Sequence, residues 1–347
     1  MTTSRDIAQI ANVSQSTVSR MLSGSARVSP RVRERILEAI AQTGYEPDIA
    51  AQSLVKRVSR TITLTLFSDP EGLAFSNLAH PQGYYFTSIL ASLEREIVAA
   101  GYDLLLPSRP FKPFSSYVQS LQKRKVAGVI MMAPQPSDAR LQALLDSNVL
   151  AVFIDAYGQG PRATYVAVDN LSGCKQAVEH LVQLGHRRVA LLIGSLIDLS
   201  GTERLLGYQR ALAQAGIALD DRLIIQANWE IEEAYQATLS LLGERPDVTA
   251  ILAASDPMAI GALRAIYERR LRVPEDISLV GFDDTDISRY LPPPLTTICP
   301  DRDQIGKFAV QALLSIIGGG QHVSPIMVPT QLIVRESTGP AATSRDV

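Results

Sequence analysis

A group of short polar side chains near the amino terminus, together with one guanidinium, has the chemistry and spacing to contact DNA. The group consists of Gln15, Ser16, Thr17, Ser19 and Arg20. Ser14 can cap a helix that begins just before them, and this helix then carries Val18, Met21 and Leu22 on one apolar face. Base edges and phosphates in a major groove are bound by such side chains at the amino end of a helix. The pattern therefore predicts a DNA-recognition helix, with an ordinary helical hairpin as the alternative.

Three aspartates form a second candidate group, because each stands at or shortly after the end of a β-rich run. They are Asp155, Asp256 and Asp283. When such runs form parallel strands, ligands bind beyond the carboxyl ends of the strands. A cleft at that edge would gather these carboxylates around a polar ligand. Carboxylates at a cleft can also imitate the acid pair of a glycosidase, so an enzyme remains an alternative at this point.

Three short helices are predicted to position the DNA-contacting group. Thr3 and Asp6 have the spacing of a capping box at the start of the first helix, and Asn12 suits the left-handed turn that follows. The apolar face of this helix consists of Ile7, Ala8, Ile10 and Ala11. A third helix begins at Pro30 and ends at Gly44. These elements predict an all-α helix-turn-helix head.

The segment that follows this head has two interpretations. Pro47 sets it apart, and residues 49–55 could form one or two helical turns, which are marginal alone in water. It is either a solvated linker or a hinge that folds only when bound to DNA. In the second case Leu54 is an apolar wedge that enters the minor groove and bends the duplex.

From Thr61 onward, β-rich runs alternate with amphipathic helical windows. Strands are predicted at 61–67, 102–106, 126–132, 150–155, 165–168, 189–193, 223–227, 250–253, 278–282 and 326–334. Helices are predicted at 87–100, 115–124, 138–148, 172–184, 203–215, 231–242, 257–269 and 303–317. Alternation of this kind predicts parallel sheets covered by helices on both faces. A break with Gly and Pro at 156–164 divides the runs into two α/β lobes.

The predicted division of the chain follows from these patterns. It comprises a head at 1–46, a hinge at 47–60, a body at 61–340 and a tail at 341–347. Within the body, the N-lobe takes 61–164 and 297–325, and the C-lobe takes 165–293 and 326–340. The tail pieces of the body thus cross between the lobes.

Charge is distributed unevenly along the 347 residues, although the net charge is only -2. Residues 1–60 carry a net charge of +4 and the remainder carries -6, which predicts a polyanionic partner for the head alone. The chain has no apolar run that could span a bilayer and no signal-peptide core, and its cysteines, Cys174 and Cys299, lack metal or disulfide spacing. We therefore expect a cytoplasmic protein without a cofactor, a metal or a membrane partner.

Motifs along nearly the whole chain resemble the lactose-repressor (LacI/GalR) family of bacterial transcription regulators. In the head and hinge these are Asp6-Ile7-Ala8, Val13-Ser14, Thr17-Val18-Ser19-Arg20, Val28-Ser29, Tyr45-x-Pro47 and Ala50-Ala51-x-x-Leu54. In the body they include Val168-Asp169-Asn170, Leu184-Gly185-His186-Arg187, Glu203-Arg204-x-x-Gly207-Tyr208, Ala254-Ser255-Asp256 and Val280-Gly281-Phe282-Asp283-Asp284. Each motif alone is weak, whereas their order and spacing are specific. The resemblance implies a helix-turn-helix head on a two-lobed, type I periplasmic-binding-protein-like body.

The resemblance also implies a homodimer that binds a palindromic operator in double-stranded DNA. Carried over by position, Gln15, Ser16 and Arg20 contact bases, Thr17 and Ser19 lie near phosphates, and Leu54 enters the minor groove beside Ala51. The full predicted DNA-binding set is Thr3, Ser14, Gln15, Ser16, Thr17, Ser19, Arg20, Arg27, Ala51 and Leu54. The implied function is a ligand-responsive repressor of a carbohydrate or related catabolic operon.

The body is expected to close on a small-molecule effector, a sugar or a sugar derivative. The predicted effector-binding set is Tyr85, Phe86, Asp155, Arg204, Trp229, Ser255, Asp256 and Asp283. Arg204 and Asp283 could clamp a polyol or an acid by charge-assisted hydrogen bonds, and Trp229 could stack on a sugar face. The alternatives are a surface ion pair for Arg204, a turn at Asp283 and plain packing for Trp229.

One departure from the family pattern bears on the ligand. The connection 68–84 is long where the family has a short turn, and Tyr85 and Phe86 follow it, either facing the ligand or packing in the helix core. Two other classes share a two-lobed fold, namely solute-binding proteins and sugar-processing enzymes. The basic head argues against the first class. The sequence has no Walker loop, no zinc spacing and no G-x-S-x-G elbow, which argues against the second.

Overall fold

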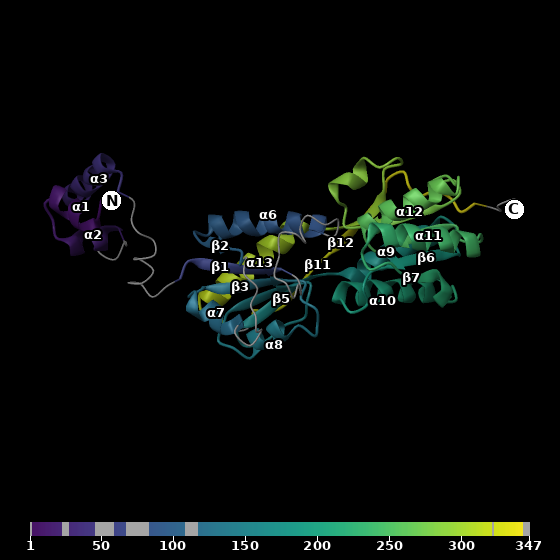
Figure 1. Ribbon diagram of the computed structural model, residues 1–347, viewed down its shortest axis with the longest axis horizontal. Coiled ribbons are helices and arrows are strands. Elements are labelled where there is room, and N and C mark those ends of the chain that lie inside the picture. The colour runs from purple at the N-terminus through teal and green to yellow at the C-terminus, as the bar shows by residue number, and fades with distance from the viewer. Residues whose placement is uncertain are drawn as a thin grey trace. The chain divides into compact units, whose positions relative to one another are not determined.

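The computed structural model describes residues 2–22, 28–45, 59–66, 83–107, 117–320 and 323–342. The chain divides into two compact units, a head at 1–60 and a body at 61–347. Figure 1 shows the head as three helices and the body as two α/β lobes. The predicted fold class is thereby confirmed, and each unit is considered by itself.

The head consists of α1 (Ser4–Ile10), α2 (Gln15–Leu22) and α3 (Pro30–Thr43). Its core consists of Ile7, Ala8, Ala11, Val18, Ile36 and Ala39, all buried. Ile10 does not join this core, because it is 51% exposed, so its assignment to the apolar face of α1 was wrong. At seven residues α1 is too short for four apolar positions to face the same neighbours.

The ends of the head helices have the local chemistry that the sequence predicts. Thr3 and Asp6 form a capping box, in which the Thr3 backbone N–H donates to Asp6 Oδ2 at 2.7 Å. These hydrogen bonds lower the pKa of Asp6. Asn12 takes a φ of 47° in the turn between α1 and α2, and Gly44 ends α3 at a φ of 59°.

The N-lobe is built on a six-stranded parallel sheet in the order β11-β5-β4-β3-β1-β2. Its strands are β1 (Thr61–Leu66), β2 (Asp103–Leu105), β3 (Gly128–Met132), β4 (Ala151–Ile154), β5 (Ala163–Val168) and β11 (Ile326–Val328). Its helices are α6 (Gly83–Ala99), α7 (Tyr117–Lys123), α8 (Ala139–Leu145) and α13 (Arg302–Ile317).

Alternation along β3 explains how helices cover both faces of this sheet. Ile130 and Met132 join the apolar cluster that includes α6 and α13. Val129 and Met131 join the cluster that includes α7 and α8. Successive strand residues point to opposite faces, so a strand buried on both sides is apolar throughout.

The C-lobe repeats the arrangement with the strand order β12-β10-β9-β8-β6-β7, in which only β10 and β12 pair antiparallel. Its strands are β6 (Val189–Ile193), β7 (Ile224–Gln226), β8 (Ala250–Ala253), β9 (Ser278–Phe282), β10 (Thr296–Pro300) and β12 (Thr330–Ile333). Two helix pairs cover it, α9 (Asn170–Gln183) with α10 (Leu199–Gln214), and α11 (Ile231–Glu244) with α12 (Asp256–Glu268). Short 3-10 turns occur at Asp221–Leu223 (η2) and Asp286–Arg289 (η3).

The sheets divide the chain differently from the predicted lobe boundaries. β5 pairs with β4 and therefore belongs to the N-lobe, although 165–168 was assigned to the C-lobe. β10, absent from the predicted strands, pairs with β9 in the C-lobe, although 297–325 was assigned to the N-lobe. The predicted strand 326–334 is two strands, one in each lobe, separated by Pro329, which has no N–H for a ladder.

Candidate functional site

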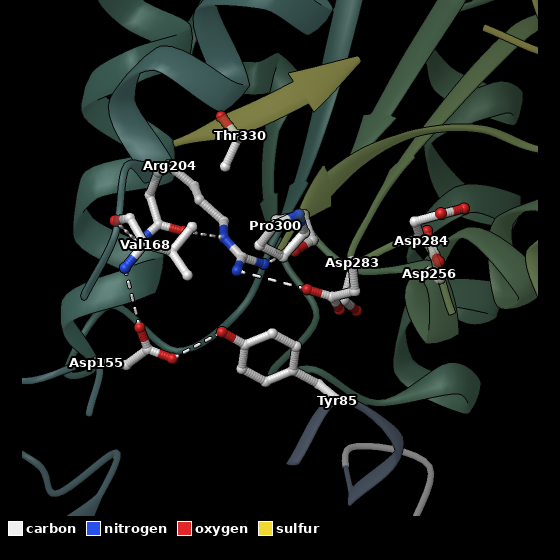
Figure 2. Close-up of polar contacts among 12 residues, drawn as sticks. Tyr85, Asp155, Val168, Arg204, Asp256, Asp283, Asp284, Pro300 and Thr330 are labelled. Carbon is white, nitrogen blue, oxygen red and sulfur yellow. Dashed lines mark hydrogen bonds and ion pairs between the residues drawn. The ribbon is translucent and has the colours of Figure 1, made fainter. Parts of the chain in front are cut away.

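A buried ion pair lies at the carboxyl end of the C-lobe sheet. Arg204 on α10 and Asp283, directly after β9, are each 5% exposed. Arg204 Nη2 lies 3.6 Å from Asp283 Oδ1 (Figure 2). Charges of this kind are buried only when they are paired and hydrogen-bonded, so the surroundings of each partner decide what the pair can bind.

The Arg204 guanidinium is held in one orientation. Its Nε donates to Asn170 Oδ1 at 2.9 Å, and its Nη1 donates to the Ala254 carbonyl. The guanidinium carbon lies 3.6 Å from the centroid of the Phe282 ring, a cation–π contact. A guanidinium fixed in this way loses little conformational entropy when it binds a ligand.

Asp283 takes an unusual backbone conformation, with a φ of 112°. Its N–H donates to the Ile298 carbonyl at 2.7 Å, and its own carbonyl accepts from Arg302 Nη1 at 2.7 Å. Burial raises the pKa of its carboxyl to about 7, although Arg204 acts in the opposite direction. The Asp283 carboxyl can therefore change charge near neutral pH when a ligand alters its surroundings.

The N-lobe supplies a second pair, Tyr85 from α6 and Asp155 directly after β4. Tyr85 donates its hydroxyl to Asp155 Oδ2 at 2.9 Å, and the Val168 N–H donates to Asp155 Oδ1 at 3.2 Å. Figure 2 shows Tyr85 and Asp155 facing Arg204 and Asp283. Burial is the main cause of a raised pKa at both Asp155 and Tyr85. The two lobes thus present four polar side chains to one place.

Two predicted aromatic residues border this group. The Phe86 ring packs edge-on against Tyr85 with ring centroids 5.0 Å apart, and Phe86 is also packed against the main core. Trp229 takes a φ of 69°, and its indole N–H donates to Asp198 Oδ2 at 2.9 Å. Arg204 lies 5.4 Å from the Trp229 ring centroid. The indole is therefore fixed beside the guanidinium, where it could stack on a ligand.

The other two residues predicted to bind the effector, Ser255 and Asp256, make hydrogen bonds within the protein. Ser255 caps α12 by accepting from the Met258 N–H at 3.3 Å. Asp256 is fully buried, and its carboxylate accepts from the hydroxyls of Thr285, at 2.9 Å, and Thr297, at 2.6 Å. Burial raises its pKa to about 6. The structure gives Ser255 and Asp256 a role in holding the end of the sheet and does not bring them into the four-residue group.

A cavity of about 550 Å³ adjoins the segments that connect the lobes. Its lining includes Ser88 of α6, Asp284 after β9, Pro300 and Arg302 before and within α13, and Thr330 of β12. Arg302 also donates to the Asp283 and Asp284 carbonyls. Through Asp284 and Arg302 this cavity adjoins the Asp283 turn, and Figure 2 shows Pro300, which also lines the cavity, between Arg204 and Asp283 in that view.

Sequence reasoning did not select several residues that hold the site together. They are Tyr157, Asn170, Asp198, Glu203 and Arg302, which bond to or lie beside the selected residues. Asn170 and Glu203 belong to the motifs Val168-Asp169-Asn170 and Glu203-Arg204-x-x-Gly207-Tyr208, so the sequence could have indicated them as site residues. Their pairing across α9 and α10 could not be read from spacing. Within the described ranges, no group of His, Cys, Asp or Glu could hold a metal ion, and no helix is long and apolar enough to cross a membrane.

The head presents the other predicted side chains on its surface. Gln15, Ser16, Ser19 and Arg20 are exposed on α2, and Thr17 is half-buried. Ser14 Oγ accepts from the Thr17 N–H at 3.1 Å, which caps α2 as predicted. The exposed Thr3 serves the capping box of α1. Arg27, Ala51 and Leu54 lie outside the described residues, as do 47–58 of the proposed hinge and 68–82 of the long connection.

Comparison with known proteins identifies both units. Residues 3–48 match the model for bacterial regulatory proteins of the lacI family, and residues 178–338 match a periplasmic binding protein-like domain. The ribose operon repressor of Haemophilus influenzae is 31% identical over 97% of this chain and 98% of its own length. This chain belongs to the LacI family. Members of the LacI family among its relatives are transcription regulators and not enzymes.

Solved structures of the LacI family extend this likeness to the whole fold. A lac repressor dimer bound to operator and the anti-inducer ONPF matches with a TM-score of 0.84 and 32% identity, over 97% of this chain and 99% of that chain. A CelR–cellobiose complex matches with a TM-score of 0.72 and 30% identity, over 97% and 100% of the two chains. As a LacI-family protein, this chain is a ligand-responsive DNA-binding transcription regulator.

Proposed function

We propose that this regulator represses a catabolic operon for a carbohydrate or a related compound, and that a sugar-like effector binds at Arg204 and Asp283. The observation that carries the proposal is the buried Arg204–Asp283 pair opposite Tyr85 and Asp155. A guanidinium donates and carboxylates accept, so together they can satisfy several hydroxyl groups of one polyol. The fixed Trp229 ring supplies the apolar surface that a sugar face requires.

The DNA-binding half of the proposal concerns the exposed face of α2. Gln15, Ser16 and Arg20 would read bases from the major groove, and Thr17 and Ser19 would contact phosphates. Two copies of the chain would place two such helices on the half-sites of a palindrome. Between them Leu54, packed beside Ala51, would open the central minor-groove step. A regulator of this kind acts where the chromosome is, so we place it in the cytoplasm.

The effector would act on DNA binding through the lobes. Residues of both lobes surround the proposed ligand position, so a bound ligand favours the lobe arrangement that places Tyr85, Asp155, Arg204 and Asp283 around it. The N-lobe begins at β1, directly after the proposed hinge, so a change in lobe angle alters the support for that hinge. The free energy available for this control is the difference in ligand affinity between the two arrangements.

A two-part experiment tests the proposal. A thermal-shift screen of the purified chain against D-ribose, cellobiose, other sugars, sugar phosphates and nucleobases should find a ligand that raises the melting temperature, since it binds only the folded state. Selection from a random DNA library should yield a palindrome, and the ligand found in the screen should change affinity for it. Arg204→Lys should lose the ligand response and keep operator binding. A selected DNA without a palindrome, or turnover of the ligand, would count against the proposal.

A further inference from the structure

One hydrogen bond joins the two lobes beside the Arg204 guanidinium. Tyr157 stands on the loop between β4 and β5 and therefore belongs to the N-lobe. Its hydroxyl donates to Glu203 Oε1, and Glu203 lies on α10 of the C-lobe. The Tyr157 ring is anchored within its own lobe by the Tyr165 ring on β5, with centroids 4.9 Å apart. A change in lobe angle must move these two partners relative to each other.

Glu203 connects the Tyr157 hydroxyl to the Arg204 guanidinium through Asn170. Its second oxygen, Oε2, accepts from Asn170 Nδ2 at 2.9 Å. The carbonyl oxygen of the same amide, Asn170 Oδ1, accepts from Arg204 Nε at 2.9 Å. Glu203 and Asn170 are 8% and 2% exposed, so water does not compete strongly for these bonds. An unbroken series of hydrogen bonds therefore runs from the N-lobe surface to Arg204.

The two ends of this series differ in exposure. Tyr157 is 50% exposed, whereas Arg204 is 5% exposed. The Tyr157 hydroxyl can thus exchange Glu203 for water when the lobes separate. Glu203 cannot do so without rearrangement, because Asn170 and the packing of α9 against α10 hold it. The exposed partner is the one that can move, and the buried partners carry the consequence to the guanidinium.

We propose that Tyr157 and Glu203 form a latch between the lobes that couples lobe closure to the orientation of Arg204. This inference rests on the proposed function, since it assigns a regulatory role at the same ligand position. Tyr157 and Glu203 are positioning residues, because they act on the ligand through Asn170 and Arg204. When the latch is made, Glu203 fixes the Asn170 amide and hence the Arg204 Nε. When it opens, Glu203 loses one of its two hydrogen-bond partners, so the Asn170 amide and the Arg204 Nε contact lose part of their support.

Tyr157→Phe removes only the latch hydroxyl, and the chain supplies a matched control. Tyr165→Phe removes a hydroxyl from the neighbouring ring of the same lobe, one without a hydrogen-bond partner among the described residues. Spin labels at Lys123→Cys on α7 and Arg210→Cys on α10 report the distance between the lobes (Figure 1). The background carries Cys299→Ser, and Cys174 stays unlabelled because it is fully buried.

The unique tryptophan gives a second readout. Trp229 lies beside the Arg204 guanidinium, so its emission reports the position of that charge. In the ligand-free chain, Tyr157→Phe should raise the ratio of open to closed lobes about tenfold, the effect of losing a hydrogen bond to a charged group, and should shift the Trp229 emission. Tyr165→Phe should change neither. In a Glu203→Ala background, which removes the acceptor of the Tyr157 hydroxyl, Tyr157→Phe should add little further change.

Each contrary result overturns a defined part of the inference. Unchanged distances in Tyr157→Phe would show that the hydroxyl does not hold the lobes. Changed distances with unchanged emission would show that the contact does not reach Arg204. Equal effects of Tyr157→Phe and Tyr165→Phe would assign the effect to ring packing. All readouts use the ligand-free chain, so failure of the latch is distinct from failure of the proposed ligand or operator, which the thermal-shift screen and DNA selection test separately.

Discussion

The DNA-contacting side chains of α2 differ in exposure from the ligand group of the body, which consists of Tyr85, Asp155, Arg204 and Asp283. Gln15, Ser16 and Arg20 are exposed, and the six buried residues of the head core support them from behind. Arg204 and Asp283 are buried, and each is paired with the opposite charge of the other. Side chains on the first surface can change without upsetting the fold. Side chains in the second group carry stability and recognition together.

This difference teaches where binding and folding are separable in the molecule. An exposed side chain that contacts a partner contributes to affinity and contributes little to the folded state. A buried charge contributes to both, because removing its partner leaves it uncompensated. We therefore expect variants in the head to alter DNA affinity at nearly constant stability, and variants in the ligand group to alter both.

The largest expected effect is that of Arg204→Met. It leaves the Asp283 carboxyl buried without its partner, and it removes the donor of two hydrogen bonds to Asn170 and Ala254. The free energy of unfolding of the body should fall by about 3–5 kcal/mol. Urea unfolding monitored by circular dichroism measures it.

A matched substitution on the same helix gives the control. Arg210→Met on α10 removes an exposed guanidinium and should change the free energy of unfolding by less than about 0.5 kcal/mol. Adding Asp283→Asn to Arg204→Met should restore part of the loss. If the double variant is as unstable as the single one, the buried charge is not the cause.

The next largest expected effect is a pH dependence of the free energy of unfolding that comes from buried aspartates of the body. Burial raises the pKa of Asp283 to about 7 and that of Asp256 to about 6, from 3.8 in the unfolded chain. The folded state therefore holds protons that the unfolded state has released. The free energy of unfolding should fall as pH rises from about 4 toward these values, by about 1.4 kcal/mol per pH unit for each group, and then level off.

Comparing two variants separates the contribution of Asp283 to this pH dependence from that of other groups. His180 and His186 act in the opposite direction, because burial lowers their pKa and stability is lost as pH falls through it. Asp283→Asn should remove the fall between pH 6 and 7, and Asp286→Asn, at an exposed residue of η3, should keep it. Urea unfolding at pH 5, 6, 7 and 8 measures both. Equal slopes in the two variants would argue against a protonated Asp283.

In the head, Arg20→Ala should weaken binding to the selected palindrome by about 1–3 kcal/mol if Arg20 reads guanine. The melting temperature of the head should stay nearly constant, because Arg20 is exposed. Fluorescence anisotropy with the palindrome and with mixed-sequence DNA of equal length gives the specificity ratio. An equal loss on both DNAs would make Arg20 a phosphate contact.

The sequence predicted local structure better than long-range pairing. The bounds of β6, β8 and β9 agree with the predicted runs, because apolar residues buried on both faces form unbroken segments. β10 was not predicted, because its Thr296 and Thr297 are buried polar residues that bond to Arg335 and Asp256, which lie far from them in the chain. The lobe boundaries failed for the same reason. Which strand joins which sheet is decided by pairing partners far apart in the chain.

The ligand group shows the same limit. Arg204 and Asp283 could be selected because each stands in a recognisable motif. The Tyr157–Glu203 contact could not, because 46 residues separate its partners and the two lobes meet only in the folded chain. Asp256 was selected by its place after a strand, yet the hydroxyls of Thr285 and Thr297 that satisfy it come from two other segments. Sequence motifs indicate which side chains belong to a site, whereas their contacts depend on how distant segments of the chain pack together.

The smallest expected effect is that of Thr3→Ala, and it tests whether the head really separates folding from binding. Thr3 was predicted to contact DNA, and it also donates to and accepts from Asp6 in the capping box. Losing the hydroxyl should lower the stability of the head by about 1 kcal/mol. Hydrogen exchange at α1 amides measures this loss. Thr3→Ser keeps the hydroxyl and should retain most of the stability, and Thr2→Ala, at the neighbouring exposed threonine, should have no effect.

If Thr3→Ala weakens operator binding at a temperature where the head is fully folded, Thr3 both caps the helix and contacts the DNA. The division between the two regions would then fail at this one residue, where the helix cap and the predicted DNA contact coincide.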